Sequence, residues 1–239
     1  MRENDILKGE QGALKRALYK SMGFTGEQLG KPIIAIANSY TNATPGHFVL
    51  KQLCESVKEG IIKEGGTPME FSTVAPCDGI AEGHEGMRYI LPTRDLIASS
   101  IECMVRAHRF DGLVLLFLRQ DCTGHADGCG QAGDAGHFPE WRPYVSGFLL
   151  RQALRREHCD RGYWVETTGR IDEEEFRHIE DIAEPCPGSC AMLGTANTMS
   201  ALSESLGMSL MGSSIIPAVL AARMAKGVET GEKIVELVQ

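Results

Sequence analysis

The chain has 239 residues, of which 43% are hydrophobic and 23% charged, with a formal net charge of −8. This length and composition are typical of a globular protein with one good hydrophobic core. The acidic balance argues against nucleic acid as a partner, and no apolar run is long enough to cross a membrane. Eight cysteines behind a polar N-terminus predict reduced thiols or metal ligands in a cytoplasmic protein.

Three segments have the pattern of buried strands. Residues 32–37 are continuously apolar, residues 69–73 alternate, and residues 112–118 form a second apolar run. Helical patterns separate these segments along the chain. The alternation predicts an α/β fold, with an open, largely parallel sheet flanked by helices.

The helices are predicted from apolar residues at helical spacing. The first has a face that starts at Leu50, includes Cys54 and Ile62, and stops before Gly65-Gly66. The second is predicted over 93–105, with Thr93 as its cap and with Leu96 and Cys103 on its apolar face. A third helix is predicted to start at Asp172, and a fourth to cover 192–206 and to end at Gly207. Residues 216–238 are predicted to form one helix, or two helices separated near Gly227.

A loop rich in glycine and in chemically active side chains follows the second strand. It runs from Thr73 to Tyr89 and contains Cys77, Asp78, His84 and Glu85. Open α/β sheets place their sites in loops after strands, so these side chains are candidates for metal or acid/base chemistry. The competing interpretation is a glycine-rich turn with one buried cysteine.

The stretch from about Phe117 to Gly147 has no hydrophobic periodicity. Structureless loops beyond roughly 15 residues are uncommon in compact domains, so 117–165 is predicted to be an aberrant, glycine-rich and poorly ordered insert. A competing interpretation is a small zinc site, whose ligands would be Cys122, His125, Cys129 and His137.

Several long motifs stand in a characteristic order, namely 31–39, Pro45-Gly46-His47, 77–89, 108–114, and Gly188-Ser189-Cys190 with 195–199. Together they resemble the N-terminal domain of the dihydroxy-acid and phosphogluconate dehydratase family. The resemblance implies a hydro-lyase of branched-chain amino-acid biosynthesis that converts a 2,3-dihydroxy acid to a 2-oxo acid. It also implies a small-molecule substrate, an iron–sulfur cluster and Mg²⁺.

The resemblance assigns two site residues. Asp78 matches a Mg²⁺-ligating aspartate, and Cys190 matches a cysteine that binds the cluster. Gly46 stands where relatives with a [2Fe–2S] cluster have a further cysteine, so [2Fe–2S] and [4Fe–4S] both stay open. His84 and Glu85 are expected to support the ligand residues or to shape their loop rather than to act as catalysts, and Cys54 and Cys103 are expected to lie in the core.

The chain departs from the family pattern after Leu116. The family has Asn-Cys-Asp-Lys there, whereas this chain has Phe117 followed by Leu-Arg-Gln-Asp-Cys. If the codons of the segment from Leu118 are translated in a reading frame shifted by one nucleotide, they can encode Cys-Asp-Lys. We therefore hypothesise a frameshift near Phe117, with the frame restored between Gly147 and Thr168.

The resemblance also implies a C-terminal β-rich domain, which contributes another Mg²⁺ ligand and a serine thought to act as base. Residues 1–239 are therefore expected to form a fragmentary dehydratase-type domain without a catalytic base and with little or no activity. Two alternatives remain open: a relative that acts on sugar acids, and a non-catalytic truncated remnant. A homodimer is a candidate assembly.

Overall fold

The computed structural model describes residues 6–117, 171–184, 186–189 and 194–239, together with two-residue strands at 136–137, 148–149 and 152–153. Apart from Phe117, which is buried, and those short strands, the predicted insert lies outside the described residues. The frameshift hypothesis and the zinc spacing concern the same stretch and stay predictions.

The described helices, short 3₁₀ turns included, are α1 (Ala13–Ser21), η2 (Gln28–Gly30), α2 (Leu50–Lys63), α3 (Asp78–Ala81), η3 (Glu85–Tyr89), α4 (Pro92–His108), α7 (Glu173–Ala183), α8 (Thr195–Ser205), η4 (Ser213–Ile215) and α9 (Ala221–Val238). None of the helices in these ranges combines the length and apolar character needed to cross a membrane.

The main sheet has the strand order β2-β1-β3-β4 and is parallel throughout. Its strands are β1 (Ile33–Asn38), β2 (Thr67–Ser72), β3 (Gly112–Leu116) and β4 (Gly136–His137). Strands β5 (Phe148–Leu149) and β6 (Gln152–Ala153) form a separate antiparallel pair. The predicted α/β class, with an open parallel sheet flanked by helices, is confirmed.

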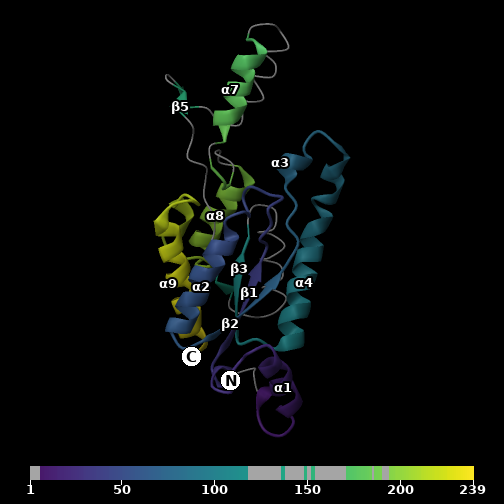
Figure 1. The fold of residues 1–239 in the computed structure, drawn as a ribbon, viewed down its shortest axis with the longest axis vertical. Helices are drawn as coiled ribbons and strands as arrows, with labels where there is room; N and C mark the ends of the chain where they lie inside the picture. Colours follow the sequence, from purple (N-terminus) through teal and green to yellow (C-terminus); the bar gives the residue numbers. More distant parts are fainter. Residues whose placement is uncertain are drawn as a thin grey trace.

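Strand β1 lies at the centre of three layers (Figure 1). Its side chains point alternately to the two faces of the sheet. Ile34 and Ile36 pack in a cluster with residues of α2 and α9, whereas Ile33 and Ala35 pack with residues of α4. Burial on both faces explains why the strand is a continuous apolar run rather than an alternating one.

Helix α9 is one helix, so of the two alternatives left open for 216–238 the single helix is the one observed, without a break near Gly227. Glycine here permits close packing of α9 on α2, two helices that lie side by side in Figure 1. A Cβ atom at Gly60 would lie 2.0 Å from the carbonyl oxygen of Val228, and one at Gly231 would lie 2.2 Å from that of Val57. A Cβ atom at Gly227 would likewise meet the Leu53 side chain at 2.8 Å.

Helix α4 begins one residue before the expected cap. Its N-cap is Leu91 and Pro92 is its first residue, because the η3 turn runs almost directly into it. The Thr93 hydroxyl therefore lies inside the first turn and donates a hydrogen bond to the carbonyl of Tyr89. The predicted capping role of Thr93 is wrong.

Three side chains expected on buried faces are exposed instead. They are Ile62, Leu96 and Cys103. In α4, the side chains that contact the sheet are spaced as Ile97, Ile101 and Val105, which turns Leu96 and Cys103 toward the outside. The prediction that Cys54 lies in the core is confirmed.

The two helices after the insert were predicted with mixed success. Asp172 caps α7 as expected, since its carboxylate accepts a hydrogen bond from the backbone N–H of Glu175. Helix α8 buries small and polar residues, including Asn197 and Ser200, while Leu202 and Leu206 of the expected apolar face are exposed. Gly207 closes α8 with a φ of +73°, as predicted.

Candidate metal-binding site at the carboxyl edge of the sheet

The carboxyl ends of the three longer strands are joined at Asn38 and Ser39. The backbone N–H of Thr73 donates to the carbonyl of Asn38 over 3.2 Å. Ser39 donates from both its backbone N–H and its hydroxyl to the carbonyl of Leu116, over 3.0 and 2.9 Å. These hydrogen bonds therefore fix the starts of the loops that follow β1 and β2 relative to each other.

The loop after β1 folds back on Ser39 through His47, whose side chain is buried. Its Nδ1 donates a hydrogen bond of 2.7 Å to the carbonyl of Ser39. Nearby, the hydroxyl of Thr44 donates to the carbonyl of Ala75 over 3.0 Å, which ties this loop to the one after β2. Gly46 is buried between Thr44 and His47.

Asp78 lies in the loop after β2, as the first residue of α3. Its side chain is buried at 7% exposure, and its Oδ1 accepts a hydrogen bond of 2.8 Å from the backbone N–H of Gly79. The thiol of Cys77, one residue earlier, is only half-buried. The loop therefore buries a carboxylate rather than the cysteine that the competing interpretation required.

The side chain of His84 makes two hydrogen bonds within the loop, as a loop-shaping residue would. The Nδ1 of His84 accepts from the backbone N–H of Gly86 over 3.0 Å, and its Nε2 donates to the carbonyl of Ile80 over 3.0 Å. A Cβ atom at Gly86 would lie 2.4 Å from the His84 ring, so a larger residue there would displace that ring. Glu85 begins η3 with its side chain in solvent.

Cys190 lies outside the described residues, so its predicted role as a cluster ligand stays a prediction. The segment just before it is well anchored to α8. Ser189 is fully buried, and its hydroxyl donates to the Oδ1 of Asn197 over 3.1 Å.

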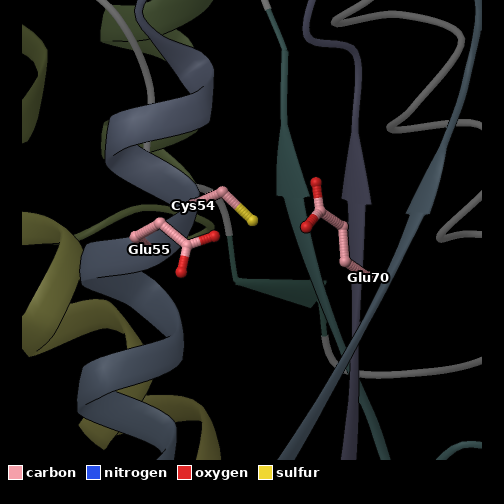
Figure 2. Close-up of side chains that lie close together, drawn as sticks. All are labelled: Cys54, Glu55 and Glu70. Atoms are coloured by element: carbon pink, nitrogen blue, oxygen red, sulfur yellow. The ribbon is translucent and has the colours of Figure 1, made fainter. Parts of the chain in front are cut away.

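One cluster of potential metal ligands occurs among the described residues, and it does not include Asp78. Ligand atoms of Cys54, Glu55 and Glu70 lie within 4.8 Å of one another between α2 and β2 (Figure 2). The ammonium group of Lys58 already bridges the two carboxylates, at 2.7 Å from each. The cluster is therefore an ion-pair network with its own cation.

The charges of this network stabilise one another. Burial and the nearby Glu70 carboxylate raise the pKa of the Cys54 thiol to about 12, so it is protonated at neutral pH. Burial also works against a charged Glu70, but hydrogen bonds from Lys58 and Asn38 outweigh it and lower the pKa of that carboxyl. Burial opposes the charge of Lys58, yet its bonds to Glu55 and Glu70 raise its pKa.

Sequence reasoning missed this network. Glu55 and Lys58 stand at the i, i+3 spacing of a helical ion pair, which was the available signal. The sequence contains no such signal for Glu70, because a carboxylate in an alternating strand has the pattern of an ordinary solvent-facing residue.

The donor chemistry of Asp78 fits Mg²⁺. This ion prefers carboxylate oxygens and is usually held by one or two carboxylates together with water and substrate. Within the described ranges, Asp78 is not grouped with two further His, Cys, Asp or Glu ligands. The residue can therefore supply one ligand to an ion, and the described residues do not form a complete cage around it.

The open parallel sheet flanked by helices makes this an α/β domain, and proteins of this class commonly bind their ligands at the carboxyl ends of the strands. Residues 31–239 match the family described as "Dihydroxy-acid/6-phosphogluconate dehydratase N-terminal", and the chain belongs to this family.

Among similar proteins are dihydroxy-acid dehydratases of three organisms. The chain is 42% identical to that of Caldicellulosiruptor bescii over 243 residues, 43% identical to that of Pyrococcus abyssi over 245, and 41% identical to that of Methanococcus maripaludis strain C7 over 244. Each match covers all of this chain and 44% of the relative. The chain thus spans less than half the length of these relatives.

Proposed function

We propose that this chain forms the metal-binding N-terminal part of a cytoplasmic dihydroxy-acid dehydratase, a hydro-lyase that converts a 2,3-dihydroxy carboxylate to a 2-oxo acid. The observation that carries the proposal is the buried carboxylate of Asp78 at the carboxyl edge of the sheet, in a chain similar over its whole length to proteins of that name. Carboxyl edges of parallel strands are where such folds bind small molecules.

In this proposal Asp78 holds Mg²⁺, and Cys190 binds an iron–sulfur cluster of the [2Fe–2S] or [4Fe–4S] type. When bound, Mg²⁺ neutralises charge on the substrate, and the cluster provides a Lewis acid for its hydroxyl group. The described residues orient this chemistry. The N–H of Gly79 fixes one oxygen of Asp78, and the bond from Thr44 to Ala75 holds the backbone three residues before it.

The family description also covers 6-phosphogluconate dehydratases, which makes a sugar acid the second candidate substrate. The three relatives compared above are all named dihydroxy-acid dehydratases, so we propose a branched-chain dihydroxy acid as the first candidate substrate.

The test is anaerobic reconstitution of the 239-residue chain with iron, sulfide and MgCl₂, followed by metal analysis and activity assays. The substrates are 2,3-dihydroxyisovalerate and 6-phosphogluconate, and the full-length Pyrococcus abyssi enzyme is the control. We expect bound iron and sulfide with little or no turnover, because the chain spans only 44% of such a relative.

Three results would contradict parts of this proposal. Stoichiometric zinc without iron would favour the cysteine–histidine zinc site. A sample that binds no metal would favour a non-catalytic remnant. Turnover at the rate of the control would show that the chain is a complete enzyme, and the faster substrate would identify its type.

A further inference from the structure

A polar network crosses from α2 to the carboxyl edge of the sheet. It starts at the ammonium of Lys58, which lies 2.7 Å from Oε2 of Glu70 on β2. The other oxygen of Glu70 accepts a hydrogen bond of 2.7 Å from the side-chain amide of Asn38, the last residue of β1. Figure 2 shows the Glu70 carboxylate directed toward α2, beside Cys54.

Asn38 connects this network to both loops of the candidate site. Its Oδ1 accepts a hydrogen bond of 3.0 Å from the backbone N–H of Tyr40, which fixes the first turn of the loop after β1. Its backbone carbonyl accepts from Thr73, at the start of the loop after β2. With an exposure of 2%, the Asn38 side chain has little water available to replace these partners.

The two loops then meet again close to Asp78. Thr44 in the first loop donates to the carbonyl of Ala75 in the second, three residues before the carboxylate. A continuous path of hydrogen bonds and short chain segments therefore runs from Lys58 and Glu70, through Asn38, to the backbone that carries Asp78. Hydrogen bonds to charged groups are among the strong ones, so the buried Asn38, held by a Glu70 side chain that is 33% exposed, can fix a loop.

We propose that Glu70 is a positioning residue for the Asp78 loop, and that it acts by fixing Asn38 rather than by binding a ligand itself. Glu70 and Asp78 are not members of one ligand group, and Lys58 already occupies the position of a cation beside Glu70. Glu70 thus fixes the geometry of the strand ends without contacting a ligand. The part of this inference that concerns metal affinity rests on the function proposed above.

The test compares amide hydrogen exchange of the unmodified 239-residue chain with its Glu70→Ala, Glu70→Gln and Glu55→Ala variants, in peptides that cover 39–49 and 73–81. Glu70→Ala removes the acceptor for Asn38, so exchange in both loops should rise about tenfold, as the loss of a hydrogen bond to a charged group predicts. In Glu70→Gln the amide oxygen can still accept from Asn38, so exchange should return close to that of the unmodified chain.

Glu55→Ala is the matched control. It removes the other carboxylate partner of Lys58 and leaves the contact between Glu70 and Asn38 in place. Both loops should then exchange as in the unmodified chain. The inference is overturned if Glu70→Ala leaves the loops unchanged, or if Glu55→Ala or Glu70→Gln loosens them equally. If Glu70→Ala does not fold, Glu70→Met replaces it, because it also removes the acceptor for Asn38, and unchanged exchange in both loops would again overturn the inference.

Mn²⁺ affinity is the second readout. It should fall about tenfold in Glu70→Ala and stay near that of the unmodified chain in Glu55→Ala and Glu70→Gln. An unmodified chain that binds no Mn²⁺ would contradict the proposed metal site, whereas the exchange experiment would still decide the role of Glu70.

Discussion

A buried carboxylate needs partners for its charge, and Asp78 has a backbone N–H donor one residue away. Glu85 lies in the same loop with its side chain in solvent. The loop therefore contains one buried carboxylate, the proposed metal ligand Asp78, and one exposed carboxylate, Glu85.

We predict that Asp78→Asn weakens Mn²⁺ binding by at least about tenfold, because the substitution removes the charged oxygen ligand that such ions prefer. Isothermal titration with Mn²⁺ measures the change. Glu85→Gln is the control, since it removes the same charge from an exposed position in the same loop. Equal losses in the two variants would mean that Asp78 acts only through the general charge of the loop.

At the scale of whole elements, the contact between α2 and α9 depends on glycine. Backbone carbonyls of the facing helix occupy the places where side chains at Gly60 and Gly231 would begin. Alanine is the better helix former by about 1 kcal/mol, so helix propensity alone would favour the substitution. The steric clash would instead lower the stability of the fold. It involves backbone atoms, which cannot move away as a flexible side chain can.

We predict that Gly60→Ala lowers the free energy of unfolding by about 2–3 kcal/mol, the upper part of the usual cost of overpacking, because the clash is with backbone atoms. Urea denaturation followed by circular dichroism measures this. The control is Gly26→Ala, because a Cβ atom at Gly26 would meet nothing within 4 Å and its φ is not positive. A stabilised Gly60→Ala variant would show that the two helices can separate without cost.

The ion pair between Lys58 and Glu70 joins α2 to β2 and makes part of the stability dependent on pH. The pKa of Glu70 is lowered from 4.5 in the folded chain, so its stabilising effect is present above pH 4.5 and is lost as pH falls through the folded pKa. Urea titrations between about pH 3 and 7 should therefore show a weaker acid-dependent loss of stability in Glu70→Gln than in the unmodified chain. Identical pH profiles would contradict the ionised state of Glu70.

The sequence predicted elements where local pattern and packing agree. Strands β1 and β3 are apolar runs buried on both faces, and the placement of Asp78 followed from the rule that sites follow strands. The sequence left one or two helices open for α9, because Gly227 indicates a break unless the facing helix is known. The role of Glu70 was hidden for the same reason, since its partners Asn38 and Lys58 are distant in sequence.

At the scale of the whole molecule, large apolar side chains in solvent gather in the stretch that follows β2. They are Val74, Ile80, Met87, Tyr89, Leu91 and Leu96. The stretch spans α3, η3 and the start of α4, and η3 contacts both neighbouring helices. Apolar surface of this kind lowers solubility when it is left open to water.

We predict that the isolated chain binds the fluorescent dye ANS and self-associates as its concentration rises. The double variant Tyr89→Ser and Leu91→Ser should reduce both effects, because it removes two of the most exposed apolar side chains in the stretch. ANS fluorescence and light scattering provide the measurements, and Leu14→Ser is a control at an exposed leucine on α1. An unmodified chain that is monodisperse and binds no ANS would contradict this prediction.

The position of α9 has a consequence for how the protein is made. Ile234 and Val235 close the same apolar cluster as Ile34 and Val114, so a sheet face built from early strands is covered by a helix that is synthesised much later. On the ribosome, a nascent chain that has not yet released α9 would present this face to chaperones or to other unfinished chains. Such long-range closure is slow and sensitive to interruption, so translation pauses before Ala221 should increase misfolding more than pauses after Val238.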